Sequence, residues 1–194
     1  MTFFTSWRMK DRQIVFAPLI PNRAFVFDVG ANYGEYTATF LGLGARCVVA
    51  IEPQGDLARF IATSFPDEVA QGRLILRTEA VGAREGVAKL YSGPDPHKSM
   101  ATLSTVFVET SRGLDWDSEP RTEVRVITLD SLIEEYGTPD YIKIDVEGFD
   151  LEVLRGLHRD ISLLSLEYNT QLRLIDIADE CIKETPNKVD GGGG

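Results

Sequence analysis

The sequence has few of the residues that build disulfides, metal sites or basic surfaces. Its 194 residues include two cysteines, Cys47 and Cys181, whose spacing fits neither a disulfide framework nor a common metal motif. Lys and Arg number 20 against 30 for Asp and Glu, which gives a formal net charge of −10. Such a surface would repel a phosphate backbone, so we expect no nucleic-acid partner. The low cysteine content favours a reducing compartment, and we expect a cytoplasmic protein.

Long apolar runs are also absent. No stretch approaches the roughly 18 apolar residues of a membrane-spanning helix, so we expect no membrane association. Residues 1–10 lack the apolar segment of a signal peptide. With 43% hydrophobic and 26% charged residues, the chain has the composition and length of one globular domain. We divide it into a lead-in over 1–23, a domain over 24–184 and a flexible tail over 185–194.

Apolar and amphipathic segments alternate along the domain. They predict strands at 24–29, 47–51 and 74–76, with helices at 35–43 and 54–65 between them. This order is typical of one half of a doubly wound α/β sheet, with the second strand beside the first and the third outside it. Beyond an irregular stretch over 82–121 that holds one strand at 87–91, the pattern predicts strands at 123–127, 141–146 and 163–168, and helices at 130–136, 150–157 and 171–184.

A glycine turn directly follows the first predicted strand, with the sequence DVGANYG over 28–34. Gly30 allows a sharp turn and close approach of a ligand, so we expect Gly30→Val to block binding while the fold survives. Asn32 tolerates a left-handed conformation, and Gly34 allows tight packing where the helix begins. The free N–H groups there suit an anion. The alternative is a tight turn without a ligand.

Acidic residues follow two of the predicted strands. Glu52 ends the second strand, where an acid can accept hydrogen bonds from ribose hydroxyls, although a surface Glu before Pro53 is the alternative. Asp145 and Glu147 end the strand over 141–146, at the sheet edge where ligands bind in open α/β folds. Both are candidate general bases, and the alternative for Glu147 is stabilisation of a helix N-terminus.

Two further groups of side chains leave alternatives open. Glu167 and Asn169 end the next strand, and with Asp145 and Glu147 they would supply oxygen ligands for a divalent cation. Carboxylates at strand ends also serve as hydrogen-bond acceptors, and we assign no metal. His97, in the irregular stretch, is a third candidate base or a solvated loop histidine.

Several motifs together resemble the FkbM family of methyltransferases. The resemblance covers about residues 24–170, and the stretch from 143 to 156 is its most distinctive part. The motifs are DVGANYGEYT over 28–37, IEP over 51–53, AVG over 80–82 followed by 86–90, TLDSL over 128–132, IKIDVEG over 142–148, EVLRG over 152–156 and LEYN over 166–169.

The resemblance implies a Rossmann-like class I fold, S-adenosylmethionine as cofactor, and methyl transfer to an oxygen of a small-molecule or glycan acceptor. The residues implied to bind the cofactor are Asp28, Gly30, Ala31, Asn32, Tyr33 and Gly34 around the methionine part, Glu52 and Pro53 at the ribose, and Ala80 and Val81 near the adenine. The candidate bases, in order, are Asp145, Glu147 and His97. A nicotinamide-dependent oxidoreductase is an alternative that the missing G-x-G-x-x-G motif disfavours, and a non-catalytic nucleotide-binding domain is another.

The class I sheet normally ends in two further strands, and nothing after residue 184 predicts them. The predicted strand over 163–168 would then form the edge of the sheet, with its unpaired backbone groups exposed. We therefore expect residues 1–23 or a second copy of the chain, in a homodimer, to cover this edge.

Overall fold

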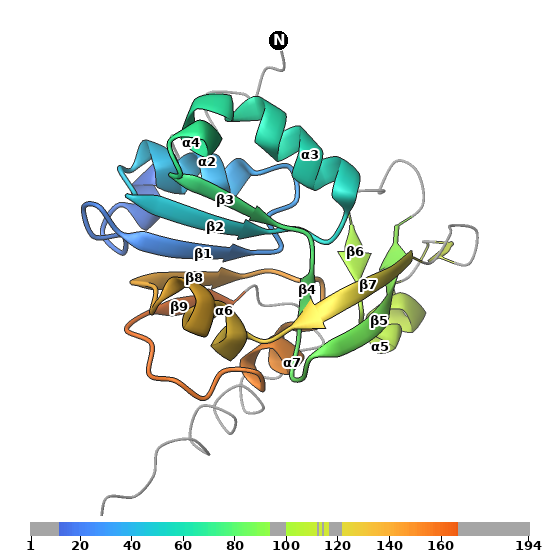
Figure 1. The fold of residues 1–194 in the computed structure, drawn as a ribbon. Helices are drawn as coiled ribbons and strands as arrows, with labels where there is room; N and C mark the ends of the chain where they lie inside the picture. Colours follow the sequence, from blue (N-terminus) through green and yellow to red (C-terminus); the bar gives the residue numbers. More distant parts are fainter. Residues whose placement is uncertain (1–11, 94–99, 112, 114, 117–121, 167–194) are drawn as a thin grey trace, which may run out of the picture.

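The computed structural model describes residues 12–93, 100–111, 113, 115–116 and 122–166. Within these ranges the main sheet has five parallel strands in the order β3-β2-β1-β8-β9 (Figure 1). The strands are β1 (Phe25–Val29), β2 (Cys47–Ile51), β3 (Leu74–Arg77), β8 (Tyr141–Ile144) and β9 (Leu164–Leu166). The predicted placement of the second and third strands beside the first is confirmed.

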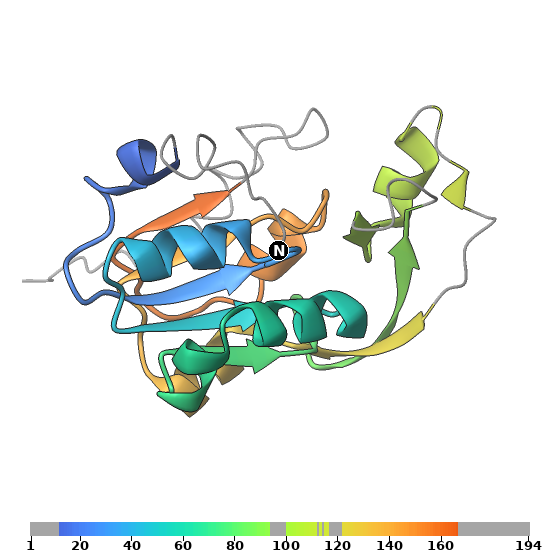
Figure 2. The same ribbon diagram turned by 90° about the horizontal axis from the view of Figure 1, so that it is seen from above.

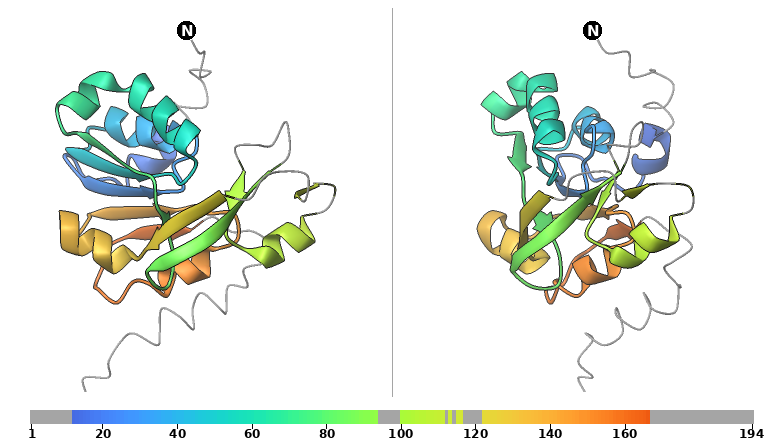
Figure 3. Two further views of the ribbon diagram at one scale, coloured as in Figure 1. Left: turned by 45° about the vertical axis from the view of Figure 1, so that its right-hand side comes forward. Right: turned by 90° about the vertical axis from the view of Figure 1, so that its right-hand side faces the viewer.

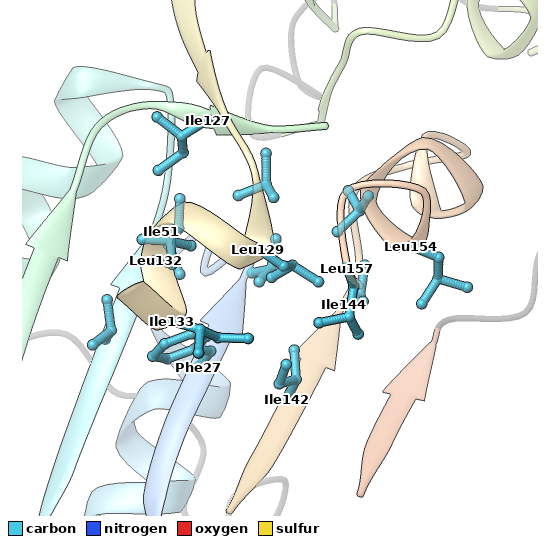
Figure 4. Packing of buried hydrophobic residues seen from close by; sticks show 14 of the residues in the cluster. Phe27, Ile51, Ile127, Leu129, Leu132, Ile133, Ile142, Ile144, Leu154 and Leu157 are labelled. Atoms are coloured by element: carbon cyan, nitrogen blue, oxygen red, sulfur yellow. The ribbon is translucent and has the colours of Figure 1, made fainter. Parts of the chain in front are cut away.

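Helices cover both faces of this sheet. They are α2 (Glu35–Gly42), α3 (Gly55–Ser64), α6 (Leu129–Tyr136) and α7 (Asp150–Leu154). Alternate side chains of β1 point to opposite faces: Val26 packs in the cluster that holds Phe40 of α2, and Phe27 packs in the cluster that holds Leu132 and Ile133 of α6 (Figure 4). Burial on both faces is why the parallel strands are almost continuously apolar.

A second sheet lies beyond the carboxyl ends of the main strands (Figures 2 and 3). Its strands are β4 (Ala80–Val81), β5 (Gly86–Ser92), β6 (Ala101–Thr102) and β7 (Thr122–Ile127), in the order β4-β7-β5-β6. The strand β5 runs antiparallel to both β7 and β6. The helix α5 (Thr105–Thr110) follows β6, and α4 (Pro66–Ala70) follows α3. Sequence patterns missed β4, β6, α4 and α5 because such short elements contain too few residues to show a period.

Some predicted boundaries differ from the structure. The strand predicted over 141–146 ends at Ile144, and a turn follows in which Glu147 and Gly148 have φ values of 52° and 81°. The helix predicted over 150–157 ends at Leu154. The helix over 171–184, the tail over 185–194 and the second cysteine lie outside the described residues.

The described part of the lead-in packs on a face of the main sheet. Residues 12–16 are helical, and the ring of Phe16 makes edge contacts with Tyr36, Phe40 and Tyr141. The side chains of the outermost described strand, β9, are half-buried. Whether the lead-in or a second copy covers the outer edge of β9 stays a prediction. No helix in the described ranges has the length and apolar content to span a bilayer.

Two glycines join the end of α7 to the second sheet. A Cβ atom added to Gly156 would lie 2.3 Å from the carbonyl oxygen of Gly82, which directly follows β4. Backbone cannot yield as a flexible side chain does, so this contact requires glycine at position 156.

We predict that Gly156→Ala lowers the free energy of unfolding by about 1–3 kcal/mol, as overpacking in a close contact does. Gly86→Ala is the matched control, because a Cβ atom there meets nothing within 4 Å. Urea unfolding of both variants measures the difference. Equal stability of the two variants would contradict the proposed contact.

Candidate functional site

A cavity lies between the carboxyl ends of β1 and β2 and the second sheet. Its volume is about 50 Å³, and it opens to solvent. Both sheets contribute apolar walls, among them Ile51, Ala80, Leu90, Leu103 and Phe149. Two carboxyl groups, Glu52 and Glu147, also line it. Apolar walls with a few polar groups suit a small organic ligand.

The glycine turn forms the floor of this cavity. Gly30, Asn32 and Gly34 have φ values of 75°, 51° and 77°, which confirms the left-handed conformation expected for Asn32. The N–H groups of Gly30 and Ala31 both donate to the carbonyl oxygen of Ile51 at 3.0 Å. A Cβ atom on Gly34 would lie 3.1 Å from Ile61 of α3, so the expected tight packing is also present.

The structure changes the expectation for Gly30→Val. A Cβ atom on Gly30 would lie 1.9 Å from the carbonyl oxygen of Asp145, which belongs to the backbone after β8. The substitution would therefore force the backbone itself to move, before any ligand is considered. This contact weighs against the expectation that the fold largely survives, so Gly30 is unsuited as a probe of ligand binding.

Glu52 is a buried carboxyl group at the end of β2, with 4% of its surface exposed. Its Oε2 accepts a hydrogen bond from the Asn32 N–H and its Oε1 one from the Gln54 N–H, both at 2.8 Å. Burial raises the pKa of Glu52 to about 7, although these two hydrogen bonds oppose the rise. Each oxygen has a second lone pair for a ligand hydroxyl. The alternative of a surface glutamate is wrong.

Glu147 lines the same cavity from the loop between β8 and α7. Burial, with the negative charge of Asp145, raises the pKa of Glu147 to about 7. Its φ of 52° is rare for a residue other than glycine, and such strain gathers at functional sites. The first turn of α7 holds Asp150 and Glu152 instead, so Glu147 lies outside that helix.

A second cavity adjoins the first, because Gly30 and Asn32 line both. Tyr36, Lys143 and Asp145 also line this second cavity. Asp145 thus lines the second cavity and Glu147 lines the first.

Most predicted cofactor residues meet at these cavities. Those that line one or both are Gly30, Ala31, Asn32, Tyr33, Glu52, Pro53, Ala80 and Val81. Gly34 and Asp28 line neither. Asp28 is fully buried beneath the turn, where its Oδ2 accepts a 2.7 Å hydrogen bond from Thr37 Oγ1.

Sequence reasoning missed Lys143, which lines the second cavity although its side chain is almost buried. The available signal was a lysine inside an apolar strand, YIKI. His97, Glu167 and Asn169 lie outside the described residues. Within the described ranges, no group of three His, Cys, Asp or Glu side chains is arranged for a metal ion.

The residues of the first cavity fit a nucleoside ligand. A buried carboxyl group suits ribose hydroxyls, the apolar walls suit a flat base, and the glycine turn leaves the backbone accessible to the ligand. Nothing about the second cavity requires a dinucleotide.

Comparisons with known proteins agree with this fit. The family model described as "Methyltransferase FkbM domain" matches residues 28–176. A crystal structure of methyltransferase FkbM from Methylobacillus flagellatus KT superposes with a TM-score of 0.57 at 20% identity, and the match covers 84% of this chain and 38% of that one. The chain therefore spans well under half the length of that protein. Comparison with curated proteins finds no match.

Two other solved structures match with lower TM-scores. Precorrin-6y C5,15-methyltransferase from Geobacter metallireducens GS-15 has a TM-score of 0.47 at 14% identity, covering 90% of this chain and 70% of that one. Ribosomal protein L11 methylase from Lactobacillus delbrueckii subsp. bulgaricus has a TM-score of 0.46 at 12% identity, and the match covers 93% of this chain and 70% of that one. The fold assignment depends on the Methylobacillus structure.

The parallel sheet, its glycine turn and the buried acid after β2 form a Rossmann-like class I fold, and the family match makes S-adenosylmethionine its cofactor. Its family follows from the match over most of the chain. The chain belongs to the FkbM methyltransferase domain family. The fold, family and cofactor expected from the sequence are confirmed.

We predict that Glu52→Ala weakens binding of S-adenosylhomocysteine by about 1–3 kcal/mol, because hydroxyl groups of the ligand lose their acceptor. Isothermal titration calorimetry measures the change. Unchanged affinity would reject the assignment of Glu52 to the ribose.

A pH dependence follows from the raised pKa of Glu52. Ribose hydroxyls donate to the ionised carboxylate, so affinity for S-adenosylhomocysteine should rise from about pH 6 to about pH 8, by up to about tenfold for a pKa of about 7. Glu52→Gln should abolish this rise, whereas Glu147→Gln should keep it. If the dependence disappears in Glu147→Gln instead, the titrating group is Glu147.

Proposed function

We propose that this domain transfers the methyl group of S-adenosylmethionine to a hydroxyl oxygen of a small molecule or glycan. The observation that carries the proposal is the Glu147 carboxyl group, which shares a cavity with Glu52 and has its pKa raised to about 7. A hydroxyl acceptor must lose its proton as it reacts, and a base with this pKa is effective near neutral pH.

Each part of the site has a role in this proposal. Glu52 holds the ribose hydroxyls, Ala80 and Val81 contact the adenine, and the second cavity receives the methionine part. S-adenosylmethionine supplies, when bound, an electrophilic methyl group on a positively charged sulfur. Glu147 would accept the proton that the hydroxyl loses, and the cofactor would leave as S-adenosylhomocysteine. Most of the rate enhancement then comes from holding acceptor and methyl group in line.

The geometry favours Glu147 over Asp145 as the base. Oδ2 of Asp145 lies 3.1 Å from the ammonium nitrogen of Lys143, and a carboxylate held by a cation is a weaker proton acceptor. Glu147 has no cation in such contact among the described residues. The order of these two candidates from the sequence is therefore reversed in the proposal.

The activity is tested with S-adenosylmethionine that carries an isotope-labelled methyl group. The protein is incubated with a panel of sugars, lipid-linked glycans and small hydroxyl compounds, and mass spectrometry locates the label. We expect labelled O-methyl product from at least one acceptor and little from the Glu52→Ala variant. Label on nitrogen would refute the oxygen assignment. Tight binding of the cofactor without transfer to any acceptor would favour a non-catalytic domain.

For an acceptor found in this way, we predict that Glu147→Gln lowers kcat by about 10²–10⁴-fold, the usual contribution of a general base. The kcat of the unaltered protein should rise with pH and level off above about 7, and this rise should vanish in the variant. Asp145→Asn is the comparison variant, and both variants are measured at saturating S-adenosylmethionine because Asp145 also lines the second cavity. A larger loss in Asp145→Asn than in Glu147→Gln would assign the base to Asp145.

A further inference from the structure

Lys143 is a charged residue in the middle of a buried strand. It is 5% exposed and pairs in register with Asp28 on the neighbouring strand β1. Around it, the face of the sheet that α2 and α3 cover is apolar, with Val26, Tyr141 and Phe40 in one cluster. A buried charge is costly unless it is paired and hydrogen-bonded, so the position of its partners shows what this lysine does.

Its ammonium nitrogen joins three parts of the site. It donates a hydrogen bond to the carbonyl oxygen of Gly30 at 3.0 Å. It also lies 3.1 Å from Oδ2 of Asp145 and 3.5 Å from Oδ1 of Asp28. The ring of Tyr36, whose centroid is 4.6 Å away, covers another side. Burial opposes the charged form, but the two carboxylates outweigh it and raise the pKa of Lys143, so the ammonium group stays charged.

If Lys143 served only to neutralise Asp28, its contacts with the Gly30 carbonyl and with Asp145 would have no explanation. Gly30 and Asp145 line the second cavity, next to the ammonium group that contacts them both. Asp28 lines neither cavity. The lysine therefore fixes one backbone carbonyl and one carboxylate that face the ligand, and Asp28 beneath it balances its charge.

We infer that Lys143 is a positioning residue, which holds the Gly30 carbonyl and the Asp145 carboxylate in the arrangement that binds the methionine part of the cofactor. The inference rests on the proposed function only in placing that part of the cofactor in the second cavity. Loss of Lys143 should then weaken ligands that carry the methionine part and spare those that carry only the nucleoside.

The experiment compares two ligands and two variants. Lys143→Met alone leaves Asp28 as an unpaired buried carboxylate, so the comparison uses Asp28→Asn and the double variant Asp28→Asn/Lys143→Met. Both lack the buried negative charge, and they differ only at position 143. Calorimetry measures the affinity for S-adenosylhomocysteine and for adenosine, and chemical denaturation measures the stability of each variant.

We expect the double variant to bind S-adenosylhomocysteine at least about tenfold more weakly than Asp28→Asn does. A loss of this size is expected when a charged hydrogen bond is removed. Its affinity for adenosine should equal that of Asp28→Asn. A merely structural role would lower both affinities together. An equal loss for both ligands, or no loss for either, would overturn the inference.

A further variant and a binding control separate the possible outcomes. If the methionine variant does not fold, Asp28→Asn/Lys143→Gln, which keeps a polar end group, is measured in the same way and must show the same selective loss. If the unaltered protein binds adenosine but not S-adenosylhomocysteine, the proposed function fails and the Lys143 inference fails with it. If the unaltered protein binds both ligands and a folded variant loses the same affinity for each, only the Lys143 inference fails.

Discussion

The parallel pairing of β1 with β2 and β8 is the constraint on which the site depends. Val29 pairs in register with both Ile51 and Ile144, the last residues of the neighbouring strands. The next residues along the chain, Gly30, Glu52 and Asp145, therefore emerge together at one edge of the sheet. A shift of one residue in either pairing would separate the turn from its acids and send the buried side chains to the wrong face.

Burial at this edge determines the chemistry of the acids. Glu52 and Glu147 are both carboxyl groups near a glycine turn, and burial raises the pKa of each to about 7. Backbone N–H groups bind both oxygens of Glu52, which fixes it as an acceptor for ligand hydroxyls. Glu147 sits on a strained loop in the same cavity and suits proton transfer. These different surroundings support the different roles proposed for two similar side chains.

The second sheet completes the cavity that the main sheet begins. Leu90 of β5 and Leu103 beyond β6 supply apolar wall that the carboxyl ends of the main strands alone would lack. The close contact between Gly156 and Gly82 connects this sheet to the end of α7. The distinctive stretch that ends at Gly156 therefore contributes to packing.

The sequence alone determined the elements that depend on residues close together in the chain. Apolar runs with short connections gave the order of β1, β2 and β3, and the DVGANYG turn had the expected left-handed residues because glycine and asparagine tolerate that conformation. Only the tertiary structure decided that β7 joins a second sheet, that Asp28 lies beneath the site, and that Lys143 contacts the Gly30 carbonyl. These features depend on partners far apart in the chain, and the residues at each position carry no local sign of which distant partner they will meet.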